Sequence, residues 1–348
     1  MGRKLLWGSL ILAPITILLR YVFHAGDVSL FVLSAAALVP LAWLIGEATE
    51  HAGEHTGPGI GGFLNASFGN APELIIALFA VADSLPEVVR GSLTGSIVSN
   101  LLLVLGLALI AGDDRERLDR SSLFVQLGLV LAAVLLFLVP AVPAFGDRPE
   151  RHSLAVATAP VAVILLVAYV AFTTWGLRRH KRLHAESGAE AGEGWPLSVA
   201  LAALGAATVV TAVTSETLVH SLDAFAEAAG LSEFFIATVI VAIVGNASEH
   251  GGAIVIAMRG KLRLASEIAV SSSAQVALFV TPAVALLSWV VTPALPLSFR
   301  PVELIAMGAS ALVVGIVLWD GRGRRGEGVL LVALYIGVAV VFFAVGDR

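Results

Sequence analysis

Eleven apolar stretches, each close to the length that crosses a bilayer, follow one another along the 348-residue chain. An α-helix needs about 20 apolar residues to span a ~30 Å hydrocarbon core. Since 58% of the residues are hydrophobic and only 14% are charged, a soluble globule is excluded. The pattern predicts an all-α polytopic membrane protein with about 11 transmembrane helices. The stretches run near residues 5–23, 28–48, 59–82, 88–111, 121–142, 152–175, 196–219, 232–258, 264–290, 299–319 and 327–346.

The distribution of lysine and arginine predicts the orientation of these spans. If the N-terminus is cytoplasmic, that side of the membrane carries 15 of the 21 basic residues and the other side carries 6. With a wrong number of spans, the basic residues would be divided more evenly between the two sides, so the asymmetry supports both the number of spans and their orientation. We therefore expect a cytoplasmic N-terminus and an external C-terminus, in the cell (inner) membrane of a prokaryote. The lipid bilayer is the expected surrounding, nucleic acid is not an expected partner, and a homo-oligomer is compatible with the sequence.

A five-residue motif occurs twice within apolar surroundings. Gly69-Asn70-Ala71-Pro72-Glu73 lies in the third stretch, and Gly245-Asn246-Ala247-Ser248-Glu249 lies in the eighth. An ionisable side chain near the bilayer midplane costs roughly 2.5–3.5 kcal/mol on insertion scales, so it usually serves a function there. Two such groups in matching sequence frames predict one shared site.

The motif belongs to a longer internal repeat. Each copy is followed by a polar segment, residues 95–104 in the first case and 271–280 in the second. Without the first span, five spans lie on each side of a polar linker. Because five is odd, the second half enters the membrane from the opposite face, which predicts two inverted repeats as in secondary transporters. The expected units are an N-terminal helix (1–27), a first five-helix repeat (28–177), a cytoplasmic linker (178–195) and a second five-helix repeat (196–348).

These segments resemble the two α-repeats of the calcium/proton exchangers, a family in the calcium/cation antiporter superfamily. The first is similar over Glu50, 62–75 and 95–106, the second over 245–250 and 271–282. The resemblance covers residues from about 28 to 346. It implies eleven helices, a Ca²⁺ site between the repeats and proton-driven Ca²⁺ export, with Glu73 and Glu249 as ion-binding residues. It also implies a transporter rather than an enzyme, with Ca²⁺ and protons as transported ions and no cofactor.

The chemistry of the motif residues favours the same ion independently. Ca²⁺ prefers six to eight hard oxygen ligands in a flexible cage. Two carboxylates neutralise the ion, and amide oxygens one helical turn earlier add ligands. The candidate metal-binding residues are therefore Glu73, Glu249, Asn70 and Asn246. The chain contains no cysteine, so thiolate metal sites and disulfides are excluded.

Backbone carbonyls are expected to complete the ion site. Pro72 has no N–H, so the carbonyl of Phe68 loses its helical partner, and such interruptions at membrane depth line cavities. Ser248 stands at the equivalent position of the second motif. There we expect the helix to open through Gly245 alone, or less fully.

Proton coupling needs no separate site, because a desolvated carboxylate takes up a proton when its cation leaves. Other polar residues in apolar spans are candidates for the ion pathway. Serine and asparagine in membrane helices also act as interhelical contacts, and carboxylates near span ends also meet the interface. The candidates for the ion pathway are Glu50, Glu216, Ser99, Asn100, Ser273 and Gln275.

Three alternative functions remain open. A Na⁺/Ca²⁺ exchanger and a broader divalent (Mn²⁺) exchanger use similar oxygen ligands. A remote alternative is an intramembrane zinc hydrolase, because His51-Ala52-Gly53-Glu54-His55 matches the H-x-x-E-H pattern. That pattern explains neither the inverted repeat nor Glu249.

Overall fold

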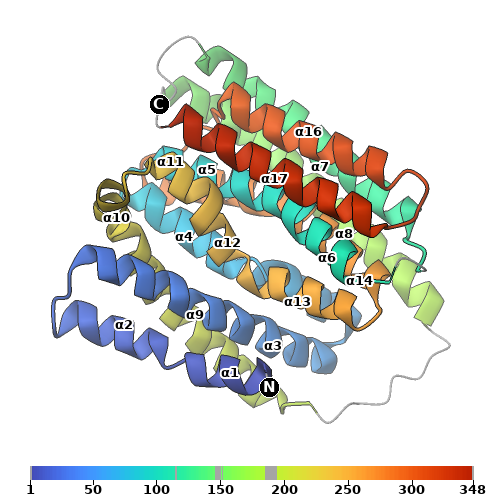
Figure 1. Ribbon diagram of the computed structural model, residues 1–348, viewed down its shortest axis with the longest axis horizontal. Helices are drawn as coiled ribbons and strands as arrows, with labels where there is room; N and C mark the ends of the chain where they lie inside the picture. The colour runs from blue at the N-terminus through green and yellow to red at the C-terminus, as the bar shows by residue number, and fades with distance from the viewer. Residues whose placement is uncertain (1, 114–115, 146–149, 151, 185–193, 347–348) are drawn as a thin grey trace.

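A computed structural model describes residues 2–113, 116–145, 150, 152–184 and 194–346 (Figure 1). In this part of the chain the regular elements are helices, and the one β-type pairing is an isolated antiparallel bridge between Arg117 and Arg322. The predicted all-α class is confirmed. Helices satisfy their own backbone hydrogen bonds, which is the condition for crossing a bilayer.

The helices of the first half run from Gly2 to His184. They are α1 (Gly2–Ser9), α2 (Leu12–Tyr21), α3 (Asp27–Phe68), α4 (Ala71–Ala82), α5 (Pro86–Val98), the π-helix η1 (Ser99–Val104), α6 (Leu105–Ala111), α7 (Arg120–Ala141), the 3₁₀ turn η2 (Val142–Ala144) and α8 (His152–His184).

The second half contains two further π-helices. Its elements are α9 (Leu197–His220), α10 (Leu222–Ala229), α11 (Glu233–Phe235), the π-helix η3 (Ile236–Val241), α12 (Ala242–Gly245), α13 (Ala247–Met258), α14 (Leu262–Gln275), the π-helix η4 (Val276–Val280), α15 (Thr281–Val291), α16 (Pro301–Val317) and α17 (Arg325–Val345).

Eight described helical segments are long and apolar enough to cross a membrane, and a ninth results if a pair bent by 110° counts as one span. The bent pair is 222–229 with 233–245. The eight segments coincide with eight of the predicted stretches. They are Lys4–Tyr21, Asp27–Thr56, Pro86–Ala111, Arg120–Ala144, His152–Thr174, Leu197–His220, Leu262–Val291 and Arg325–Val345.

The other three predicted stretches, 59–82, 232–258 and 299–319, contain shorter helical pieces. In the first two, the helix is interrupted at the repeated motif, so no uninterrupted piece within either stretch reaches spanning length. In the third, α16 is apolar and 17 residues long. The total of eleven spans therefore stays a prediction. Counting helices by their length gives fewer spans, because two of the stretches are interrupted and α16 is short.

The two motifs interrupt their helices at the same residue. Asn70 lies between α3 and α4 with φ −95° and ψ 10°, and Asn246 lies between α12 and α13 with φ −98° and ψ 11°. The first break leaves two residues outside the helices and the second, where Ser248 replaces the proline, leaves one. The side-chain amide of Asn246 donates to the carbonyl oxygen of Ala242 at 2.9 Å, so it competes with the backbone for that acceptor. The backbone N–H of Asn246 still donates to the same carbonyl at 3.3 Å, so the second helix opens less fully than the first, as expected.

The helices pack reciprocally between the two halves. α4 packs on α9 while α13 packs on α3, and α6 packs on α17 while α15 packs on α8. α5 and α16 form one pair, and α14 and α7 form the matching pair. Figure 1 shows α2, α3 and α9 along one side, α4, α12 and α13 across the middle, and α7, α16 and α17 along the other side. The motif breaks consequently lie in the central layer.

Gly95 allows the closest approach between helices of opposite halves. A Cβ at this position would overlap the carbonyl oxygen of Thr238 in η3. Thr238 in turn donates its hydroxyl to the carbonyl of Phe234, one turn earlier. The absence of a side chain at Gly95 therefore lets α5 cross η3 in direct backbone contact.

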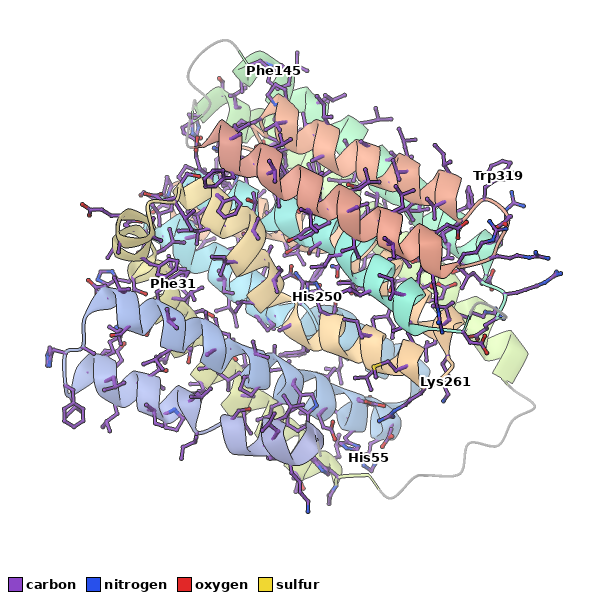
Figure 2. The ribbon with its side chains drawn as sticks, in the orientation of Figure 1. Phe31, His55, Phe145, His250, Lys261 and Trp319 are labelled. Carbon is purple, nitrogen blue, oxygen red and sulfur yellow. The ribbon has the colours of Figure 1, made fainter. Side chains whose placement is uncertain are left out.

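The predicted cytoplasmic loops lie at one end of the bundle. Figure 2 shows His55, Lys261 and Trp319 toward that end, and Phe31 and Phe145 toward the other. α8 continues to His184, so it extends into the predicted linker, and residues 185–193 of that linker lie outside the described residues. Arginine and lysine are good helix formers, and a helix that has left the bilayer needs no apolar surface.

Candidate ion-binding site

The repeated motifs place two glutamates at equivalent points of two interrupted helices. Glu73 is in the first turn of α4, and Glu249 is in the first turn of α13. Glu73 is 7% exposed, whereas Glu249 is more accessible. The first turn of a helix favours an anionic side chain through the helix dipole. The carboxyl groups are near enough to interact electrostatically, as a site shared by the two motifs requires.

Asn246 connects the two halves of this site. Its Nδ2 donates to Oε1 of Glu73 at 2.6 Å and to Oγ of Ser96 at 2.8 Å. Gly245, immediately before it, lies against Glu73, because a Cβ there would be 3.0 Å from Cγ of the glutamate. A larger residue than glycine would therefore push the first glutamate out of its position.

Further hydrogen bonds extend from the motifs to the polar segments that follow them. Oγ of Ser272 donates to Oε2 of Glu249, and Nδ2 of Asn100 donates to Oγ of Ser272 at 3.0 Å. Nδ2 of Asn70 donates to Oε1 of Gln275 at 2.8 Å. Each asparagine in the site thus bonds to a side chain of the opposite half, and the polar network closes across the repeat interface.

Most of the residues predicted for the site meet there. Six of them take part in the contacts described above. Glu73, Glu249, Asn246 and Asn100 are linked to one another, through Ser272 in the last case, and Asn70 and Gln275 form a separate pair across the same interface. Ser99 and Ser273 are buried on the same helices, but their hydroxyls donate to backbone carbonyls, those of Ser96 and Ile97 respectively.

The other two predicted pathway residues lie away from this network. Glu50 is exposed on α3. Glu216, on α9, accepts from Nη2 of Arg20 at 3.1 Å and from the hydroxyl of Tyr21 at 3.5 Å, and both donors lie at the end of α2. In the described residues, neither glutamate hydrogen-bonds a residue of the central network.

Ser96 and Ser272 are contacts that the sequence analysis missed. Ser272 stands 23 residues after Glu249, and Ser96 stands 23 residues after Glu73. An alignment of the two repeats on their glutamates would have paired these serines. The residues predicted from the sequence, Ser99, Asn100, Ser273 and Gln275, lie one to four positions further along the chain.

A small cavity adjoins the first glutamate. Its wall consists of hydroxyl and carboxyl oxygens together with aliphatic side chains. Ser92, which contributes one of the hydroxyls, precedes Ser96 by one turn of α5. The cavity is lined by Glu73, Ile76, Ser92, Leu93, Ser96, Val241, Ala242 and Gly245.

The atoms available here to bind a metal are oxygens of carboxylate, amide, hydroxyl and backbone groups. Such oxygen ligands suit a hard cation such as Ca²⁺. No cluster of three or more His, Cys, Asp or Glu side chains suited to a metal occurs in the described part of the chain. The H-x-x-E-H pattern forms no such cluster either. Nδ1 of His51 faces Oε2 of Glu54 at 3.3 Å, whereas Nε2 of His55 lies 2.7 Å from the carbonyl oxygen of Trp195.

Comparison with known proteins places the chain in a family. The family model described as "Sodium/calcium exchanger protein" matches residues 27–177 and 199–344. A Ca(2+)/H(+) antiporter from Aphanothece halophytica is 35% identical over 361 residues, which cover 98% of this chain and 96% of the relative. The Ca(2+)/H(+) antiporter ChaA from Bacillus subtilis (strain 168) is 38% identical over 330 residues, covering 92% and 93%.

A solved structure agrees with the sequence comparison. Native YfkE is similar with a TM-score of 0.82 at 35% identity, over 99% of this chain and 100% of that one. The relatives are thus matched along nearly their whole length, including both motif regions. The chain belongs to the sodium/calcium exchanger protein family and, within it, to the calcium/proton exchangers.

Proposed function

We propose that this protein is a secondary active antiporter that exchanges cytosolic Ca²⁺ for external protons. The observation that carries the proposal is the pairing of Glu73 and Glu249 across the two halves, with Asn246 bonded to the carboxylate of the opposite motif. The relatives named as Ca(2+)/H(+) antiporters support this exchange reaction. Transport by exchange requires no chemical step on a substrate, so no catalytic residue is assigned.

Binding of Ca²⁺ would use both glutamates together with neutral oxygens. Glu73, Glu249, Asn70 and Asn246 are the proposed ligands, and the carbonyl groups that end α3 and α12 are suited to complete the shell. The C-terminal ends of interrupted helices carry partial negative charge, which favours a cation. The hydrogen bonds that Asn246 and Ser272 make to the glutamates hold these carboxylates in place when no cation is bound.

Protons and Ca²⁺ would compete for the same carboxylates. A site with two carboxylates alternates between one divalent cation and up to two protons, because metal binding requires deprotonated ligands. The carboxylates are neutralised both when Ca²⁺ is bound and when they are protonated. In either state the site can switch between the two sides of the membrane without exposing an uncompensated charge to the hydrocarbon core. Coupling follows from this exclusion and needs no further titrating group.

Alternating access is proposed to arise from the two inverted five-helix repeats, 28–177 and 196–348, with 1–27 outside the repeat and 178–195 as the connecting linker. The reciprocal packing of the helices supports this division. α3 and α9, which pack on each other and on the motif helices, are best placed to move across the mouths of the site.

The proposed ion pathway runs along the helices that follow the motifs. Ser99, Asn100, Ser273 and Gln275 would line it near the glutamates. Glu50 and Glu216, toward the C-terminal sides of the α3 and α9 spans, would attract cations at opposite mouths, and Arg20 would have to release Glu216 for that role.

The protein is proposed to lie in the cell membrane of a prokaryote with the N-terminus inside and the C-terminus outside. Ca²⁺, protons and the lipid bilayer are then its partners. A homo-oligomer is compatible with this placement, because many exposed residues of α8, α16 and α17 are large and apolar.

Transport into reconstituted vesicles tests the function directly. Ca²⁺ uptake is measured first under an imposed pH gradient and then under an imposed Na⁺ gradient. Uptake driven by protons and not by Na⁺ is expected. Uptake driven only by Na⁺ would establish the Na⁺/Ca²⁺ alternative, and equal proton-driven uptake of Mn²⁺ would establish the broader divalent exchanger.

A further inference from the structure

Two arginines face each other across the loops that precede α7 and α17. The isolated antiparallel bridge pairs Arg117 with Arg322, and the N–H of Leu118 donates to the carbonyl of Gly321 at 3.0 Å. Gly321 has φ +71°, a conformation that glycine adopts without strain, and this turn brings Arg322 opposite its partner. Paired residues in an antiparallel bridge have Cβ atoms about 4.5–5.5 Å apart on one face, and like charges there destabilise the pairing.

Neither arginine side chain is paired with an acidic group in the described part of the chain, and the contact of Arg322 with Oδ1 of Asp320 is through its backbone N–H at 3.0 Å. Both are exposed, and neither makes an ion pair with an acidic residue of the described chain. Acidic residues of these two loops are paired with other arginines. Arg263 bonds to Asp119 at 2.6 Å, and Arg324 bonds to an aspartate and a glutamate of its own segment at 2.5 and 3.0 Å. Among the described residues, the bridge therefore presents two adjacent guanidinium groups that make no ion pair.

The bridge lies at the end of the apolar helices, beside an exposed aromatic side chain. Trp319 is 63% exposed, and the guanidinium carbon of Arg120 lies 4.6 Å from the centre of its ring. Figure 2 places Trp319 and Lys261 at the same end of the bundle. α7 begins and α16 ends within a few residues of the bridge. Tryptophan beside the ends of apolar helices marks the depth of lipid headgroups.

We propose that Arg117 and Arg322 together bind the phosphate of one anionic phospholipid. A guanidinium group donates two parallel hydrogen bonds to phosphate oxygens, and two such groups on one face satisfy a single phosphate from both sides. The headgroup depth selects a lipid over a soluble anion. The bound lipid joins the α6–α7 loop of the first half to the α16–α17 loop of the second, and the site is independent of the ion exchange proposed above.

Native mass spectrometry of the full-length protein in detergent tests this. The protein is titrated with phosphatidylglycerol, with phosphatidylcholine of the same acyl chains, and with inorganic phosphate. The test variant is R117Q/R322Q. The control is R259Q/K261Q, which removes the same charge at the same end from two exposed residues that are not bridged to each other.

We expect the wild-type protein and the control variant to retain one phosphatidylglycerol in preference to phosphatidylcholine. R117Q/R322Q should lose that binding by about tenfold or more, since charge-assisted bidentate contacts are among the strongest hydrogen bonds. An equal loss in both variants, no loss in the test variant, or equal binding of inorganic phosphate overturns the proposal. R117K/R322K, which keeps the charge but not the fork geometry, should bind weakly, and it replaces the glutamine variant if that one does not fold.

Discussion

At the scale of single residues, the proposed ion site rests on two carboxylates. Glu73 and Glu249 belong to different halves and are held by Asn246 and Ser272. In the proposed site each glutamate supplies one of the two negative charges that neutralise the cation. Removing either one leaves a single negative charge for a divalent cation.

Replacing Glu73 or Glu249 by glutamine should abolish Ca²⁺ transport and leave the fold intact. Glutamine keeps the shape of the side chain but loses the charge and the exchangeable proton. The loss of transport should exceed about 100-fold. Mutating a residue that only hydrogen-bonds to a metal ligand already costs about 10–100-fold in metal affinity or activity. Uptake is compared with that of Glu227→Gln, an exposed glutamate on α10, in vesicles with equal amounts of protein. Most of the activity surviving in either site variant would contradict the shared site.

Apparent Ca²⁺ affinity should weaken as the pH falls. Protonated carboxylates cannot bind the ion, so acid favours the release of Ca²⁺ and alkali favours its binding. Each competing carboxylate can weaken the affinity by up to about tenfold per pH unit once it is mostly protonated. Equilibrium Ca²⁺ binding is measured between mildly alkaline and mildly acidic pH. A flat affinity in a protein that still exchanges would mean that protons travel by another route.

At the scale of helices, function depends on interruptions and close crossings rather than on regular spans. Both motif helices break at an asparagine, and π-helical turns follow the polar segments of α5 and α14. Such turns often occur at functional sites. The crossing of α5 with η3 at Gly95 brings Ser96 to Asn246.

Gly95→Ala should therefore disrupt the protein more than an ordinary glycine substitution in a helix. The new Cβ would overlap the carbonyl oxygen of Thr238, and main-chain atoms cannot rotate away. Overpacking of this kind costs about 1–3 kcal/mol. Thermal unfolding and transport are measured beside Gly128→Ala, where no heavy atom lies within 4 Å of the added Cβ. Equal thermal stability and transport in both variants would show that α5 and η3 do not need this contact.

At the scale of the whole molecule, reciprocal packing suggests that the two halves exchange conformations around the central pair. The distance between α3 and the α7–α16 side should differ between Ca²⁺-loaded and proton-loaded protein, while the α7–α16 distance stays constant. The chain has no native cysteine, so spin-label pairs can be introduced without background. Exposed positions are Val32 and Leu312 for the moving pair, and Leu135 and Leu312 for the control pair. Equal changes in both pairs, or none in either, would contradict this motion.

The carboxyl groups of Glu73 and Glu249 should stay close in both access states. In a Ca²⁺-bound structure each should reach the same ion at about 2.3–2.6 Å. A separation above about 12 Å in both the inward-open and the outward-open state would exclude a common ion, since the ligand atoms could not meet.

The sequence by itself determined the membrane class, the paired motifs and the chemistry of the site. Apolar runs, buried carboxylates and the absence of cysteine are properties of composition and spacing, and they do not depend on how the helices pack. Glu73, Glu249, Asn70, Asn246, Asn100 and Gln275 could be selected for this reason. The family resemblance rested on the same residues.

Only the tertiary structure decided which side chains touch. Ser96 and Ser272 join the site because α5 and α14 cross the motif helices, and Glu216 meets Arg20 because α2 packs beside α9. The second helix breaks at Asn246 without a proline, and the side-chain amide there bonds both to Ala242 of its own helix and to acceptors on other helices. A linear sequence contains no information of this kind directly, since such contacts depend on crossing points set by small residues such as Gly95 and Gly245.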